Sequence, residues 1–160
     1  MLNLSQEAEL LRKVPMFSKM EPSKLKLLAF TSESLTFEDG EELCHYGEPA
    51  DCAFVIMSGE VAIMVDTDEG EVAGFVRGAN ELIGEMAVLT NSPRSATMRA
   101  KGETVAMRIS DDAFIKLLRE NPEISLDVMR TLSNRLAETN AKFQQLQVQL
   151  QRYESGQLGS

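Results

Sequence analysis

The residues best suited to chemistry lie in one stretch, residues 82–97, with the sequence LIGEMAVLTNSPRSAT. Arg94 is the only cation between Arg77 and Arg99, and its planar guanidinium matches the geometry of a phosphate. Glu85 stands nine residues before it. An ionised carboxylate only accepts hydrogen bonds, so it suits sugar hydroxyls rather than a phosphate. Together the two side chains predict a pocket for a sugar phosphate.

Small residues and a short helical turn accompany these two side chains. Residues 86–89 predict one turn of helix, whose free backbone N–H groups can face an anion. Ser95 adds a hydroxyl donor, and the small Ala96 lets the backbone approach a ligand. The stretch therefore predicts ligand contacts from both side chains and backbone.

This stretch resembles the phosphate-binding cassette of the cyclic nucleotide-binding domain family. There, Gly-Glu, a short apolar turn and Pro-Arg-small-Ala-Thr follow one another at the spacing seen here. The resemblance extends over nearly the whole chain and is nearest to the sensor domain of the bacterial cyclic AMP receptor branch. One departure is Asn80, where a glycine is usual. Asparagine tolerates a left-handed backbone, so we expect the turn there to survive.

The resemblance implies a role for each residue of the cassette. Arg94 would pair with the cyclic phosphate, Glu85 would accept from the ribose 2′-OH, and Ser95 would donate to the phosphate or touch the purine. Backbone contacts would come from Gly84, Met86, Ala87 and Ala96. The implied ligand is cyclic AMP, with cyclic GMP possible, and no metal is implied. The alternative is a structural Glu85–Arg94 ion pair in a degenerate, ligand-free barrel that acts as a dimeric interaction protein.

The elements expected to position the cassette are short helices, then strands, then one long helix. Residues 5–32 predict helices interrupted at prolines. Residues 35–109 predict short strands with glycine turns, including a hairpin at residues 58–60 and a turn at residues 101–102. This order predicts an α+β fold, in which an antiparallel β-barrel or jelly roll follows N-terminal short helices and precedes a long C-terminal dimerisation helix.

The long helix, expected over residues 122–154, carries a heptad pattern. Its core positions are Met129, Leu132, Leu136, Thr139, Phe143, Leu146, Leu150 and Tyr153. A helix of ~30 residues is ~45 Å long, so most of it extends past a domain of this size. The pattern therefore predicts a coiled coil, most simply in a parallel homodimer. By resemblance to the dimer helix of the cyclic AMP receptor branch, Thr139 and Asn140 would touch the purine.

The sequence predicts one sensor module rather than several domains. Residues 1–125 are expected to form the cyclic nucleotide-binding barrel with its flanking helices, residues 126–155 the coiled-coil helix, and residues 156–160 a disordered tail. The resembling receptors continue into a DNA-binding helix-turn-helix, whereas this sequence ends in a glutamine-rich helix. We therefore expect a stand-alone sensor or the truncated sensor half of a DNA-binding transcription regulator, with the downstream protein partner left open.

Composition disfavours several classes of partner. The 160 residues include 16 basic and 25 acidic side chains, for a net charge of −9, and no Lys or Arg lies between Lys26 and Arg77. Such a surface repels nucleic acid, so no nucleic-acid binding by this chain itself is expected. No apolar run approaches the ~20 residues of a membrane span, and no secretory signal is evident. We expect a cytoplasmic protein without membrane contact.

Two further kinds of site, a metal site and a catalytic site, have little support in the sequence. His45, with Cys44 and Cys52 nearby, offers at most a sparse metal site, and a polar loop residue is the simpler interpretation. One Glu and one Arg facing a phosphodiester provide no paired general acid and base. A ligand-sensing module is therefore expected, and not an enzyme.

Overall fold

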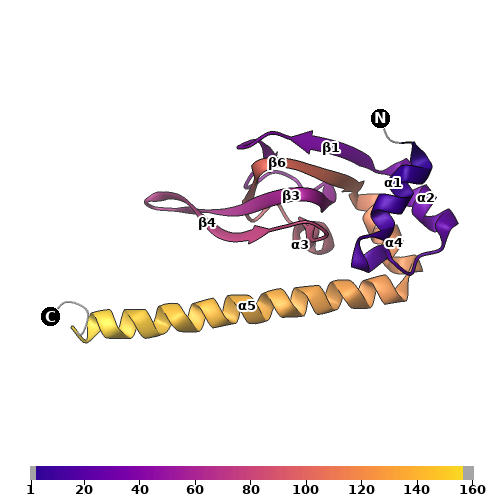
Figure 1. Ribbon diagram of the computed structural model, residues 1–160. Helices are drawn as coiled ribbons and strands as arrows, with labels where there is room; N and C mark the ends of the chain where they lie inside the picture. The colour runs from indigo at the N-terminus through magenta and orange to yellow at the C-terminus, as the bar shows by residue number, and fades with distance from the viewer. Residues whose placement is uncertain (1–2, 157–160) are drawn as a thin grey trace. The chain divides into compact units, whose positions relative to one another are not determined.

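The computed structural model describes residues 3–156, which divide into two units, one reaching to Glu120 and the other starting at Asn121. Figure 1 follows the chain through both units. The first unit contains α1 (Leu4–Arg12), a 3-10 turn (Pro15–Phe17), α2 (Pro22–Thr31), β1 (Glu33–Phe37), β2 (Glu42–Cys44), β3 (Cys52–Thr67), β4 (Gly70–Arg77), β5 (Leu82–Ile83), α3 (Glu85–Thr90), β6 (Thr97–Ser110) and α4 (Asp111–Glu120). The second contains α5 (Pro122–Glu154).

The strands form one six-stranded antiparallel sheet in the order β1–β6–β3–β4, with β2 also pairing with β6 and β5 with β3. Within residues 3–156, β1 and β4 end this path and do not pair with each other. The antiparallel α+β fold is therefore confirmed, but the sheet is not a closed barrel. Register shifts bend the long strands, and such a bend curves a sheet without joining its end strands.

Two turns predicted from the sequence are wrong. Residues 58–60 lie inside the continuous strand β3, and residues 101–102 lie inside β6. The register moves from Ser58 opposite Val105 to Glu60 opposite Lys101, so two steps along β3 correspond to four along β6. The glycine signals here mark a bulge in a strand pair rather than a reversal of the chain.

The core of the sheet is built around the first half of β3. Its buried cluster joins Phe54 and Ile56 of β3 to Ile83 of β5 and Ala106 of β6. The rings of Phe37 and Phe54 meet edge to face at 6.5 Å. Residues 52–56 are buried without alternation, which is typical of a strand covered on both faces. Helices α1, α2 and α4 gather at one end of the sheet, and α4 packs on β3 and β6 (Figure 1).

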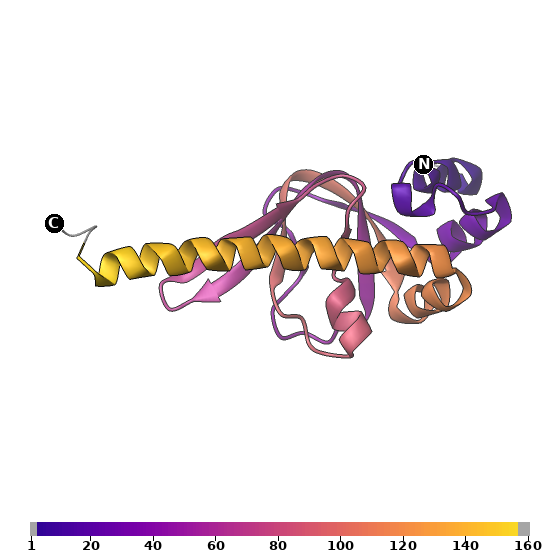
Figure 2. The same ribbon diagram turned by 90° about the horizontal axis from the view of Figure 1, so that it is seen from below.

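Within residues 121–156, the second unit is built from the 33-residue helix α5, whose bounds are those expected from the sequence. Pro122 at its first position and Glu123 in its first turn are typical of a helix start. Figure 2 shows α5 as one unbroken helix. Residues 157–160 of the tail expected at its end lie outside the described residues. None of the helices in residues 3–156 has the length and apolar character needed to span a membrane.

Candidate functional site

The candidate site is the segment from β5 to β6, in which two left-handed residues bound a short helix. Gly84, with a φ of 76°, precedes α3, and Asn91, with a φ of 51°, follows it. The helical turn expected from the sequence is confirmed and reaches Thr90. Asn80 also has a positive φ, 71°, so it adopts the backbone for which a glycine is usual. These reversals bring the loop at residues 91–96 back toward the start of α3.

The side chain of Arg94 is buried, with 3% of its surface exposed. Its Nη1 donates to the carbonyl oxygen of Gly84 at 2.9 Å. Its Nη2 donates to the carbonyl oxygen of Cys52 at 2.6 Å and to the Sγ of Cys52 at 3.4 Å. A buried cation is costly unless it is well bonded, and these acceptors are neutral. The guanidinium is therefore fixed in direction while its charge remains available to an anion.

Gly84 is required by its closeness to this guanidinium. A Cβ added to Gly84 would lie 2.7 Å from Nη1 of Arg94 and 3.8 Å from the carbonyl oxygen of Cys52. The positive φ is a second reason for glycine, because left-handed backbone strains other residues. A side chain larger than that of glycine at position 84, just before α3, would therefore displace the guanidinium of Arg94.

The backbone of Arg94 is held by the loop between β2 and β3. Its N–H donates to the carbonyl oxygen of Glu48 at 2.8 Å, and its carbonyl oxygen accepts from the N–H of Gly47 at 2.8 Å. These bonds and the guanidinium contacts fix both ends of the residue. The position of this side chain is therefore set by the protein itself.

The other predicted cassette residues divide by exposure. Glu85, the first residue of α3, has 4% of its surface exposed, and Ala87 and Ala96 have 8% each. Met86 is 60% exposed and Ser95 is also exposed, so both are accessible to a ligand. All seven cassette residues therefore lie on one segment, in which Arg94 contacts the carbonyl of Gly84.

Thr139 and Asn140 lie in the second unit, on α5, and both are exposed. The hydroxyl of Thr139 donates to the carbonyl oxygen of Arg135 at 2.9 Å, a contact within the helix. Their contact with a ligand stays a prediction.

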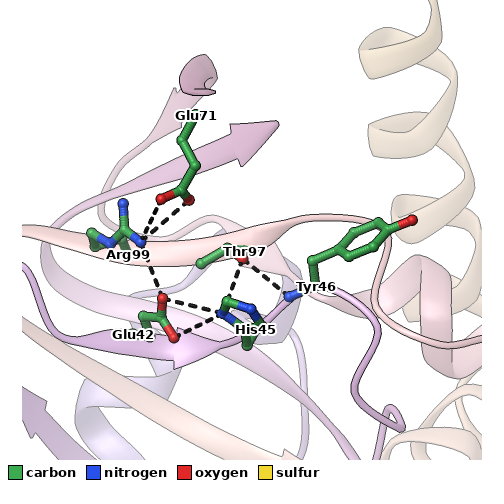
Figure 3. A network of polar contacts seen from close by, with 6 residues as sticks. All are labelled: Glu42, His45, Tyr46, Glu71, Thr97 and Arg99. Atoms are coloured by element: carbon green, nitrogen blue, oxygen red, sulfur yellow. Dashed lines mark hydrogen bonds and ion pairs between the residues drawn. The ribbon is translucent and has the colours of Figure 1, made fainter. Parts of the chain in front are cut away.

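A polar network fastens the loop that holds Arg94 (Figure 3). The buried Oγ1 of Thr97 accepts from the backbone N–H of Tyr46 at 3.0 Å and lies 3.4 Å from Nδ1 of His45. Nδ1 of His45 in turn lies 3.1 Å from Oε1 of Glu42. Thr97, the first residue of β6, thus holds the loop immediately before Gly47.

Arg99 extends this network across the sheet. Its Nη2 donates to Glu42 of β2 at 3.0 Å and to Glu71 of β4 at 3.2 Å (Figure 3). The hydrogen bond from Arg99 lowers the pKa of the Glu42 carboxyl. These exposed pairs are individually weak, and their structural effect is to tie β2 and β4 to β6.

The two cysteines are free thiols beside the site. Burial raises the pKa of the Cys52 thiol to about 11, and burial also raises the pKa of Cys44. Both are therefore protonated at neutral pH. Within residues 3–156, no three His, Cys, Asp or Glu side chains are arranged to hold a metal ion.

Several residues that hold Arg94 were missed by sequence reasoning. Gly47 and Glu48 act through backbone atoms, which every residue type offers, so composition carries no signal for them. Cys52 acts through its carbonyl oxygen and its Sγ, and its contact with Arg94 joins residues far apart in the sequence. Thr97 could have been identified from the sequence, because it is the last residue of the Pro-Arg-small-Ala-Thr pattern.

Comparison with known proteins agrees with this geometry. The model of the family described as "Cyclic nucleotide-binding domain" matches residues 34–121, more than half of the chain. A CRP-like cAMP-activated global transcriptional regulator of Mycobacterium tuberculosis is 29% identical over 133 residues, which cover 82% of this chain and 59% of that protein. A cAMP-dependent protein kinase type II regulatory subunit of Drosophila melanogaster is 33% identical over 69% of this chain and 29% of that protein.

Among solved structures, the sensor domain of the transcriptional regulator DNR from Pseudomonas aeruginosa matches with a TM-score of 0.70 and 27% identity. The match covers 81% of this chain and 88% of that chain. By their names, all three relatives are regulators or parts of regulators. The chain spans 59% or less of the length of the two sequence relatives.

Proposed function

The chain belongs to the cyclic nucleotide-binding domain family, and from this premise we propose that it is a sensor module that binds cyclic AMP in preference to cyclic GMP. Arg94 binds the cyclic phosphate, Glu85 accepts from the ribose 2′-OH, and Ser95 donates to the phosphate or touches the purine. Gly84, Met86, Ala87 and Ala96 contribute backbone contacts. The preference for cyclic AMP is supported by two relatives that are named as cAMP-activated or cAMP-dependent.

The observation that carries this proposal is the state of Arg94. A guanidinium with 3% of its surface exposed is oriented by two backbone carbonyls and a thiol, all of them neutral. A cyclic phosphate carries one negative charge, which would compensate this cation through charge-assisted hydrogen bonds. Helix α3 begins at Glu85, directly after Gly84, and the backbone N–H groups at its start would be further donors to the phosphate.

We further propose that the module signals as a parallel homodimer through α5. The heptad positions Leu136, Phe143, Leu146, Leu150 and Tyr153 are each more than half exposed in the single chain. An exposed apolar line at this spacing is typical of a coiled-coil seam. As the resemblance to the receptor dimer helix implies, Thr139 and Asn140 would contact the purine.

Calorimetric titration of the whole chain with cyclic AMP and with cyclic GMP tests this function. We expect saturable binding of both, with the tighter binding for cyclic AMP. If neither nucleotide binds to folded protein, the ligand-free interaction protein becomes the better account. A tighter affinity for cyclic GMP would reverse the proposed preference while leaving the cassette assignment intact.

A further inference from the structure

Cys52, the first residue of β3, holds the guanidinium of Arg94 with two of its atoms. The carbonyl oxygen and the Sγ both accept from Nη2, at 2.6 Å and 3.4 Å. The residue has 3% of its surface exposed, and its backbone is fixed opposite Ser110 of β6. The thiol therefore lies in a rigid position beside the group proposed to bind phosphate.

The charge of the side chain at position 52 determines whether the guanidinium of Arg94 is available to bind a phosphate. A neutral sulfur is a weak acceptor that gives direction without cancelling the positive charge. A carboxylate in the same place would form a strong, charge-assisted pair with the guanidinium and would compete with a phosphate for it. Since burial raises the pKa of the thiol to about 11, the native residue is in its neutral form at pH 7.

We propose that Cys52 is a positioning residue that orients Arg94 for an anion, and that a neutral side chain at this position is a condition for phosphate binding. This inference rests on the proposed function, in which Arg94 receives the cyclic phosphate. It assigns to Cys52 a role that is separate from metal binding and from thiol reactivity.

The direct test compares two variants of nearly equal shape, Cys52→Asp and Cys52→Asn, in the full chain. We expect Cys52→Asn to bind cyclic AMP within about 3-fold of the native protein. We expect Cys52→Asp to bind about 30-fold or more weakly, because its carboxylate occupies the guanidinium. Equal affinities in the two folded variants would overturn the inference.

A second measurement needs no nucleotide. In protein with nitrogen-15 in its arginines, the side-chain resonances of Arg94 are identified by their loss in Arg94→Lys. We expect them to shift in Cys52→Asp relative to Cys52→Asn, because an ion pair forms. Unshifted resonances would contradict the inference. Shifted resonances in a chain whose native form binds no cyclic nucleotide would support the positioning role and reject the proposed function.

If Cys52→Asp fails to fold, Cys52→Ser and Cys52→Val replace it. Serine keeps a neutral acceptor beside Nη2, whereas valine removes it. We expect serine to keep near-native affinity, and valine to weaken cyclic AMP binding by about 3- to 10-fold while broadening the Arg94 resonances. Equal cyclic AMP affinities and equal Arg94 resonances in the serine and valine variants would overturn the inference.

Discussion

Arg94 is a charged side chain in a buried position, and backbone carbonyl groups around it accept its hydrogen bonds. The residue has 3% of its surface exposed, yet hydrogen bonds from the guanidinium reach the carbonyl oxygens of Gly84 and Cys52. Carbonyl acceptors satisfy the donors of the guanidinium without neutralising its charge. An anion that reaches this position gains more than it would at the surface, where water screens the charge.

Gly84→Ala tests the contact between the start of α3 and Arg94. The added Cβ would lie 2.7 Å from Nη1 at a φ of 76°, so the guanidinium must move and the backbone is strained. We expect cyclic AMP affinity to fall by about 10-fold or more and stability by about 1–2 kcal/mol. Calorimetry and thermal melts measure the two effects. Native affinity in Gly84→Ala would show that this contact does not shape the site.

The proposed role of Glu85 makes a prediction about the ligand rather than the protein. A buried carboxylate that accepts from the ribose 2′-OH loses that hydrogen bond when the hydroxyl is absent. The lost hydrogen bond costs about 1–3 kcal/mol, or roughly 5- to 150-fold in affinity. Competition binding with 2′-deoxy cyclic AMP measures this difference. If the deoxy analogue competes as well as cyclic AMP, Glu85 has another function.

Residue types predict the chemistry proposed for the site, but they do not predict the contacts that hold Arg94 in place. Arg94 and Glu85 could be found from their types and spacing, because a forked cation and a hydroxyl acceptor each demand particular residues. Gly84 was predicted only through the family resemblance. The backbone bonds of Gly47 and Glu48 to Arg94 could not be found in either way, because they join segments more than forty residues apart through atoms common to all residues.

Among the elements, the strand pair β3 and β6 shows why a glycine can wrongly predict a turn. Gly59 has a φ of 89°, as a hairpin turn would require, but the chain continues in the same strand. A Cβ on Gly59 would lie 2.5 Å from the carbonyl oxygen of Glu103 and 2.6 Å from Oγ1 of Thr104. Close approach of the partner strand is a tertiary property, and it produces the same local sequence signal as a turn.

Gly59→Ala and Gly102→Ala form a matched pair at this bulge. Both glycines have a positive φ, but a Cβ on Gly102 meets nothing within 4 Å. We expect Gly102→Ala to cost about 1–2 kcal/mol from backbone strain alone. Gly59→Ala adds overlap with the backbone of β6 and should cost about 2–4 kcal/mol. Urea unfolding measures both, and equal losses would show that the close approach is unimportant.

For the whole molecule, the proposed dimer and the proposed ligand site imply linked equilibria. If a purine touches α5 from both subunits, cyclic AMP binds the dimer more tightly than the monomer. By linkage the nucleotide then strengthens the dimer by the same free energy, typically about 1–3 kcal/mol. Sedimentation with and without cyclic AMP measures the shift. A monomer at tens of micromolar in both conditions would reject the coupled dimer.

The seam itself is tested by Leu146→Asp, at a heptad position that is 63% exposed in the single chain. A charge there cannot be buried in a coiled-coil core without a large penalty. We expect monomers with an intact first unit and weakened cyclic AMP binding. Gln147→Asp, the next residue along and outside the heptad core, is the control and should remain dimeric. Equal oligomeric states for the two variants would place the interface elsewhere.

The most direct test of the central claim is the affinity of Arg94→Ala for cyclic AMP, measured by calorimetry on folded protein. Removing a charge-assisted phosphate contact should weaken binding by about 30- to 1000-fold. Arg12→Ala, which removes a partly exposed cation of α1 paired with Glu9, is the control and should bind as the native chain does. Native affinity in Arg94→Ala would contradict the assignment of residues 84–96 as the phosphate site.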